Sequence, residues 1–190
     1  MEANALRRDD RRADGAPAGI TVRPAVPADL PALIASVDRC SDLTVYRRFH
    51  GVAGPAVRRE LQRIATPTPD HRSWVAVDPG GGIHGTASLA RGRDGTVEAA
   101  FLVEDAWFRR GIGRMLFAAV AAGAWRTRVA MVTVTIQAEN TRALRFLRAM
   151  VPGVRPAFVG DGIVEATVDV PALAVRALER AERAARGEAA

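Results

Sequence analysis

The spacing of hydrophobic residues changes along the chain, and each change predicts a different element. In residues 132–137, VTVTIQ, apolar and polar side chains alternate strictly. This period of two predicts a strand with Val132, Val134 and Ile136 on its buried face. Across residues 111–125 the apolar positions follow the spacing of an amphipathic helix instead. The two segments are adjacent, so they predict a helix that leads into a buried strand.

Shorter patterns predict the remaining elements. Asn140 is a good N-cap and opens a helix with arginines at 142, 145 and 148 on its polar side. An Asp94-Gly95 turn joins two apolar runs into an antiparallel hairpin. Further strands are predicted at 20–23, 74–77, 83–90, 96–103, 154–159 and 163–168, and further helices at 27–37, 41–50, 57–64 and from Pro171 onward.

This order of elements predicts an α+β fold: a mixed, mostly antiparallel sheet of about seven strands flanked by helices. The chain has 190 residues, 48% of them hydrophobic, which is enough for one domain and short for two. We expect that domain at 19–170. A disordered tail at 1–18 and a C-terminal helix at 171–190 complete the predicted organisation.

Composition argues against several classes of protein. Cys40 is the single cysteine, which excludes a disulfide within the chain, and the three histidines show no zinc-ligand spacing, so we predict no metal. We expect Cys40 to be an inert, buried residue. The first residues lack the apolar core of a signal peptide, and the longest apolar run is about half a membrane span. A cytoplasmic protein without a membrane partner is therefore expected.

The positive charge is concentrated in one region. The formal net charge is +6, and five arginines but no acid lie between Asp105 and Glu139, whereas the N-terminal tail is electrically balanced. One interpretation is a noncatalytic module that binds nucleic acid. The balanced tail, the 5% aromatic content and the absence of basic runs interleaved with aromatics argue against it. The other interpretation is a site for a polyanionic ligand.

The sequence RRGIGR at 109–114 favours a phosphate ligand. Gly111 and Gly113 stand where a helix begins, so the backbone can approach a ligand closely and offer it free N–H groups. A Walker loop is excluded because the chain has no lysine, and a Rossmann fingerprint because Leu116 occupies the position of its third glycine. The alternative interpretation is that this segment binds no phosphate and forms a tight turn that packs the helix against the sheet, with its arginines in solvent.

Two segments, VEAAFLVEDAWFRRGIGRMLFAAV and VTIQAENTRALRFLRAM, resemble the acetyl-CoA core of the Gcn5-related N-acetyltransferase (GNAT) superfamily. A shorter segment, SDLTVYRRFHG, resembles the "S-x-x-S-x-x-x-R-F" stretch of bacterial protein-lysine acetyltransferases. The resemblance departs from the family pattern at Phe108, where relatives carry Gln or Arg. Arg109, Arg110 or Arg114 could supply the missing phosphate contact.

The resemblance implies that a bulged strand ending at Val103 splays from the strand at 132–137 and leaves a gap for acetyl-CoA. The pantetheine arm would pair with the first strand, the loop would bind the pyrophosphate, and an asparagine would contact the pantetheine. The implied cofactor-binding residues are Phe101, Leu102, Val103, Arg109, Arg110, Gly111, Ile112, Gly113, Arg114 and Asn140.

The resemblance also implies direct attack of an amine on the thioester, with Glu98 as the catalytic base. Strand parity places Glu98 with Ala100 and Leu102, and burial there would raise its pKa; an exposed strand-end carboxylate is the alternative. Glu104 and Asp105 would be the next candidates for the base, although we expect them to orient the loop or to pair with its arginines. Many relatives carry a tyrosine general acid where this chain has Leu147, so water would protonate the thiolate.

The function that follows is an acetyl-CoA-dependent N-acetyltransferase acting on a primary amine, either a protein lysine or a small amine. The chain is expected to be a monomer or a homodimer. The nucleic-acid-binding module remains the rival hypothesis.

Overall fold

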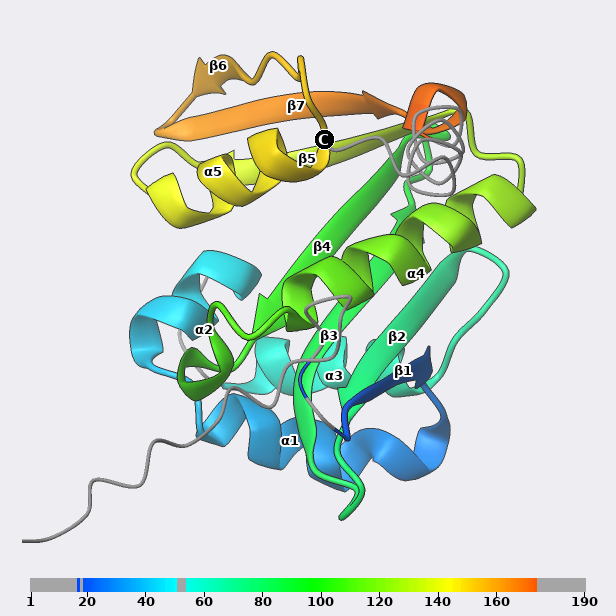
Figure 1. Cartoon of the computed structure of the whole chain (residues 1–190), viewed down its shortest axis with the longest axis vertical. Helices are drawn as coiled ribbons and strands as arrows, with labels where there is room; N and C mark the ends of the chain where they lie inside the picture. Colours follow the sequence, from blue (N-terminus) through cyan, green and yellow to red (C-terminus); the bar gives the residue numbers. More distant parts are fainter. Residues whose placement is uncertain (1–16, 18, 51–53, 174–190) are drawn as a thin grey trace, which may run out of the picture.

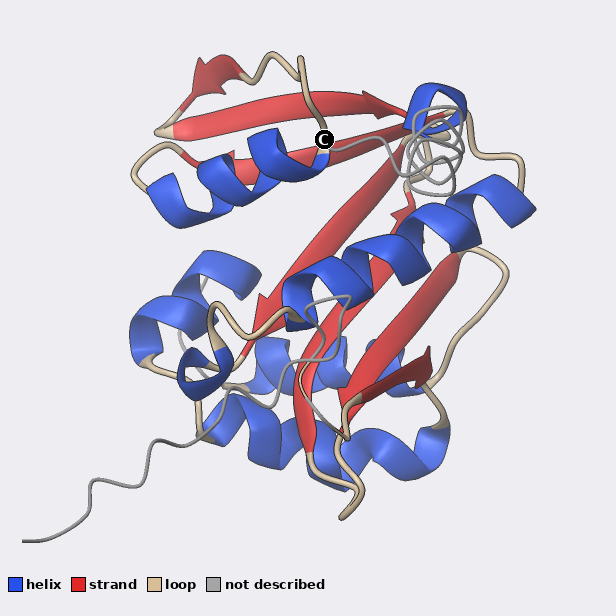
Figure 2. Cartoon of the chain, viewed as in Figure 1, coloured by secondary structure: helices blue, strands red, loops and turns tan. Residues whose placement is uncertain are grey.

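The computed structural model describes residues 17, 19–50 and 54–173 and contains a seven-stranded sheet with helices on both faces (Figures 1 and 2). The strands are β1 (Thr21–Pro24), β2 (His71–Val77), β3 (Ile83–Arg91), β4 (Val97–Val103), β5 (Met131–Gln137), β6 (Ala157–Gly160) and β7 (Ile163–Asp169). The α-helices are α1 (Leu30–Asp38), α2 (Asp42–Phe49), α3 (Pro55–Ala65), α4 (Ile112–Arg126) and α5 (Thr141–Met150), with short 3-10 turns η1 (Pro27–Asp29) and η2 (Asp105–Trp107).

The strands lie in the order β1-β2-β3-β4-β5-β7-β6. Only the β4–β5 pair is parallel among the described strands, and α4 connects these two strands. The other pairs are antiparallel. The predicted α+β class and the mixed, mostly antiparallel sheet are therefore confirmed.

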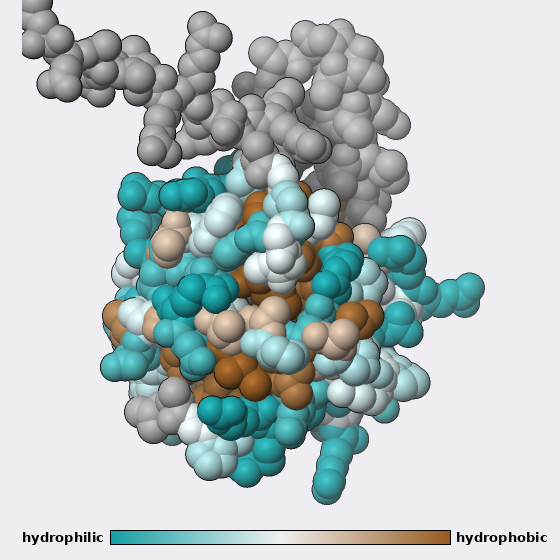
Figure 3. All heavy atoms as spheres, turned by 90° about the horizontal axis from the view of Figure 1, so that it is seen from below, coloured by the Kyte–Doolittle hydropathy of each residue, from teal (hydrophilic) through white to brown (hydrophobic). Residues whose placement is uncertain are grey.

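The sheet separates two hydrophobic cores. Figure 1 shows α4 in front of β2, β3 and β4, with α1 and α3 behind them. The front core joins Ile112 and Leu116 of α4 to alternate residues of the strands, and the rear core joins Leu33 of α1 and Leu61 of α3 to the opposite side chains. Seen from the end where α1 lies, hydrophilic side chains surround a smaller apolar area (Figure 3).

Element boundaries depart from the sequence patterns where tertiary contacts decide them. β2 begins at His71, earlier than predicted, because pairing with β3 extends through a polar stretch that the hydrophobic pattern cannot detect. β6 begins at Ala157, later than predicted. Residues 170–173 are helical, but the rest of the predicted C-terminal helix and nearly all of the predicted tail lie outside the described residues.

The contact between α4 and β2 depends on a glycine. A Cβ built at Gly123 would lie 2.4 Å from Cζ2 of the buried Trp74 ring. We expect Gly123→Ala to lower the free energy of unfolding by about 1–3 kcal/mol, because overpacking outweighs the better helix propensity of alanine. Urea denaturation measures this loss. Ala122 is exposed on the same helix, so Ala122→Val should cost less than about 1 kcal/mol. An unchanged midpoint for Gly123→Ala would mean that Trp74 moves aside freely.

Candidate active site

The two parallel strands at the centre of the sheet separate along their length. β4 and β5 are in register only at Glu98 and Thr133, and Figure 1 shows them diverging from that point. The backbone groups of β4 beyond Glu98 therefore have no strand partner on the β5 side. A segment that can hydrogen-bond to an extended ligand is left open.

The divergence does not arise from a bulge. β4 pairs with β3 from Val97 through Val103 without a shift of register. The bulge implied by the family resemblance is thus not present between these strands. β5 pairs instead with β7 along its whole length.

A cavity of about 580 Å³ occupies the gap. Phe101, Leu102 and Val103 form its strand wall, and Asn140 and Phe146 form part of the opposite wall. The loop between β4 and α4 closes one end. The volume lies within the range of small-molecule and cofactor sites.

The end of the cavity is built by a backbone turn that needs a glycine. Gly111 is the N-cap of α4 with φ +88°, and Arg109 before it also has a positive φ of 60°. The side chain of Ile112 is fully buried and anchors the turn. The first N–H groups of α4 lack acceptors within the helix and, with the helix dipole, favour an anion at this point. Gly113 in the first turn has Phe146 so near that an added Cβ would lie 3.3 Å from its ring.

Several arginines surround this end of the cavity. Arg109 and Arg114 line it, as does Arg142 of α5, whose guanidinium lies 3.9 Å from the centre of the Phe108 ring. Arg110 does not line it and instead lies over Trp107, 5.1 Å from the ring centre. Of the predicted cofactor-binding residues, Arg110 alone is outside the cavity wall.

Asn140 joins the cavity to the start of α5. Its Oδ1 accepts a hydrogen bond from the Ala143 N–H at 3.2 Å, which confirms the predicted N-cap. This bond uses the oxygen and leaves the amide NH₂ as a donor toward the cavity. Asn140 therefore has both a structural role and a polar group facing the gap.

A second cavity, of about 490 Å³, adjoins the first and includes residues of α2, α3, β3 and β4. Phe101, Phe117 and Phe146 contribute aromatic rings to its wall, with ring centres 6.3 to 6.4 Å apart. Glu98 contributes a carboxylate. The two cavities meet at Phe101 and Asn140, which line both.

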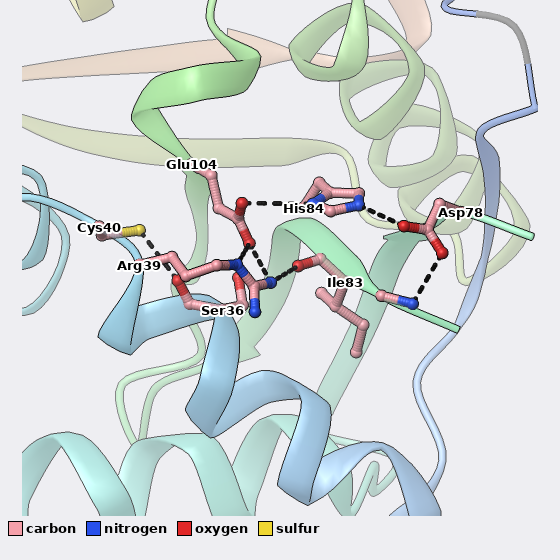
Figure 4. Close-up of polar contacts among 8 residues, drawn as sticks. Ser36, Arg39, Cys40, Asp78, Ile83, His84 and Glu104 are labelled. Atoms are coloured by element: carbon pink, nitrogen blue, oxygen red, sulfur yellow. Dashed lines mark hydrogen bonds and ion pairs between the residues drawn. The ribbon is translucent and has the colours of Figure 1, made fainter. Parts of the chain in front are cut away.

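A network of charged and polar side chains holds the loop after β4 in place (Figure 4). Buried Glu104 accepts from Arg39 Nε at 3.1 Å and lies 3.2 Å from Nδ1 of His84. The other ring nitrogen of His84 lies 2.7 Å from Asp78 Oδ2, and the ring stacks on Trp107 with centres 4.2 Å apart. The network connects α1 and β3 to the turn that leads into α4.

Asp105 ties the same loop to α2. Its carboxylate accepts from the N–H and hydroxyl of Ser41 at 2.8 and 3.0 Å and from Thr44 Oγ1 at 2.8 Å. Glu104 and Asp105 therefore orient the loop as expected, but their partners are Arg39, Ser41 and Thr44 and not the arginines of the loop. Neither acid lines the two cavities.

Residues 20–150 match the model of the acetyltransferase (GNAT) domain. The chain belongs to the GNAT acetyltransferase family. The matched range contains β1 through α5, and therefore both strands of the gap and the loop that closes it.

Solved structures of a GNAT domain, a putative acetyltransferase and an acyltransferase have a similar fold. The GNAT domain of a Streptomyces lividans PAT is 24% identical over 78% of this chain and 89% of its own, with a TM-score of 0.68. A putative acetyltransferase from Salmonella typhimurium, solved with its cofactor acetyl-CoA, is 18% identical over 80% and 94% of the chains, with a TM-score of 0.62. A cAMP-binding acyltransferase from Mycobacterium smegmatis is 26% identical over 80% of this chain but 44% of that one, with a TM-score of 0.54.

The position of Glu98 in this acetyltransferase corrects one expectation. Glu98 is exposed, whereas Leu102 on the same face of β4 is buried and Ala100 is half-buried. Strand parity identified the face correctly, but this end of the face borders the open cavity. The burial that strand parity predicted for Glu98 is therefore not present. As the catalytic base, Glu98 remains a proposal.

Cys40 is half-buried in this GNAT domain, and its Sγ donates to the Ser36 carbonyl at 3.3 Å. Burial, and then the negative charges of Asp105 and Glu104, raise the pKa of the thiol to about 12. We expect iodoacetamide at pH 8 to alkylate the folded protein roughly thirtyfold more slowly than the urea-unfolded chain, because less thiolate is present although each thiolate is more nucleophilic. Equal rates in the two states would contradict this environment.

Several site residues of the acetyltransferase were not predicted. Nothing in the sequence points to Arg39 and His84 as the partners of Glu104. The arginines of α2, Arg47 and Arg48, line both cavities. Their segment was singled out only by its short resemblance to bacterial lysine acetyltransferases.

Among the described residues, no helix combines the length and apolar character that a membrane span needs, and no cluster of potential metal ligands occurs.

Proposed function

We propose that this chain transfers the acetyl group of acetyl-CoA to a primary amine, a protein lysine or a small amine, by direct attack. The observation that carries the proposal is the cavity between β4 and β5, which ends at the Gly111 turn and the start of α4. A long polar molecule with a pyrophosphate at one end and an extended arm at the other matches this shape and charge.

Each part of the cavity has a role in this proposal. The pantetheine arm pairs with the open backbone of Phe101 to Val103, the α4 amides with Arg109, Arg114 and Arg142 bind the phosphates, and Asn140 donates to the arm. The amine nitrogen forms a bond to the thioester carbon, and the C–S bond breaks. Glu98, directly or through water, accepts the proton that the amine loses, and the departing thiolate takes a proton from water.

Titration of the protein with acetyl-CoA by calorimetry tests this function. We expect saturable binding with a dissociation constant below about 1 mM, together with release of free CoA thiol when an amine is added. Absence of binding near that concentration would reject the proposal. Salt-dependent binding of DNA or RNA that acetyl-CoA does not compete with would instead favour the noncatalytic nucleic-acid-binding module.

A further inference from the structure

Two consecutive arginines at the end of α2 face the cavities with incomplete hydrogen bonding. Arg47 and Arg48 line both cavities, and the Nε of each is buried without a hydrogen-bond partner among the described residues. The side chain of Arg48 is only 10% exposed. A guanidinium withdrawn from water and not fully paired is costly, and an anion that enters the cavity would offset that cost.

The nearest protein groups neutralise Arg48 only in part. Its Nη2 lies 3.8 Å from Oε1 of Glu60, beyond a hydrogen bond, and makes a long contact of 3.4 Å to Ser88 Oγ. The other oxygen of Glu60 accepts from Arg63 at 2.9 Å, so this carboxylate is shared. Burial lowers the pKa of Arg48, whereas Glu60 and Glu98 raise it; an arginine in such a site still carries its charge at neutral pH.

The position of Arg48 relates it to the proposed reaction. Ser88 on β3 stands opposite Ala100 on β4, and Ala90 opposite Glu98, so these side chains face the same side of the sheet. Arg48 and Glu98 both line the cavity of about 490 Å³. This cavity thus presents a cation and a carboxylate, and their arrangement complements a molecule that carries both an anionic group and an amine.

We propose that the acceptor is a free amino acid or a related aminocarboxylate, whose carboxylate binds Arg48 while its amine lies toward Glu98. The inference rests on the proposed acetyl transfer and narrows its acceptor class. A lysine of a protein would enter by its four-carbon stem alone, so carboxylates of neighbouring residues would stay outside and could not reach a side chain that is nine-tenths buried.

Matched pairs of acceptors test this inference. Each pair compares an amino acid with the amine that lacks its carboxylate, such as phenylalanine with phenethylamine and lysine with cadaverine, at saturating acetyl-CoA. For the preferred pair we expect kcat/KM to be at least about tenfold higher for the amino acid. The amine that lacks the carboxylate leaves Arg48 unpaired. Arg48→Gln should abolish this preference by raising KM for the amino acid and not for the amine that lacks the carboxylate. Arg48→Lys should restore part of it.

Arg59→Gln provides the matched control, because Arg59 is exposed and lines neither cavity; it should keep the preference. Circular dichroism verifies that all variants fold. Equal losses for both members of each pair in Arg48→Gln would make Arg48 a purely structural residue and overturn the inference. Faster acetylation of lysine peptides than of any aminocarboxylate would also overturn the inference. A dependence on Arg48 that appears only with succinyl-CoA as the donor would overturn it too, because Arg48 would then bind the donor's carboxylate and not the acceptor's.

A binding measurement separates this inference from the proposed function. Saturation-transfer NMR on the CoA complex detects amino acids that bind without reacting. Binding that is lost in Arg48→Gln, without any acetylation, would reject the proposed transfer but support the anionic subsite. Failure of every amino acid in the panel to bind would reject the subsite, even if simple amines are acetylated.

Discussion

Replacing Gly111 by glutamate is expected to weaken acetyl-CoA binding by at least about a hundredfold. Gly111 has φ +88° at the N-cap of α4, a conformation that costs a residue with a side chain roughly 1–2 kcal/mol. The new carboxylate would also stand where the helix N-terminus favours the pyrophosphate. Calorimetric titration of the variant with acetyl-CoA measures the loss.

A second glycine provides a control for the strain and the charge that the Gly111 substitution introduces. Gly95 in the β3–β4 turn has φ +85°, and an added Cβ there would meet open space. Gly95→Glu should therefore impose similar strain and the same charge at a position outside the cavity wall. We expect this variant to bind acetyl-CoA as tightly as the unmodified protein. If Gly111→Glu bound as tightly as this control, the pyrophosphate would have to lie elsewhere.

Glu98→Gln is expected to lower kcat/KM by roughly a hundredfold or more while acetyl-CoA affinity stays nearly unchanged. An amine like that of lysine has a pKa of about 10.4, so its deprotonation near pH 7 costs roughly 4–5 kcal/mol. A carboxylate at the cavity wall lowers this cost by receiving the proton, directly or through water. Steady-state rates across pH, with calorimetry for the cofactor, measure both quantities.

The matched control is Glu165→Gln, which removes an exposed strand carboxylate on β7 that lines neither cavity. Its rates should equal those of the unmodified protein. If Glu98→Gln kept both its rate and its pH profile, the base would have to be a group other than Glu98. Glu104 and Asp105 would be poor substitutes, because bonds to Arg39, Ser41 and Thr44 hold them outside the cavities.

The central strand–helix–strand unit could be predicted from the sequence because each of its elements keeps one period over many residues. The alternation at 132–137 predicted β5 closely, although Ile136 is half-buried where it borders the second cavity. The turn at Gly111 could be predicted because its left-handed backbone, with φ +88°, favours glycine. The first residues of β2 could not, since only pairing with β3 makes them a strand.

Predictions about single side chains failed where distant segments decide their surroundings. The parity of β4 identifies the face of Glu98 but not whether a helix covers it. Arg48 belongs to a polar-looking helix end, and only the packing of that helix beside Glu60 and Ser88 removes it from water. His84 has its partners at Asp78 and Glu104, and Glu104 lies twenty residues further along the chain, directly after β4.

The single register pair between β4 and β5 also bears on aggregation. Exposed strand edges usually invite pairing with other protein chains, and natural proteins protect them. Here the two unpaired edges face each other inside the molecule, and the walls beside them carry Phe101, Phe117 and Phe146. A second sheet cannot grow from either edge, because the opposite strand already occupies the far side of the gap. The open backbone groups of β4 and β5 can therefore pair with a ligand in the gap, while these two edges do not pair with strands of other protein chains.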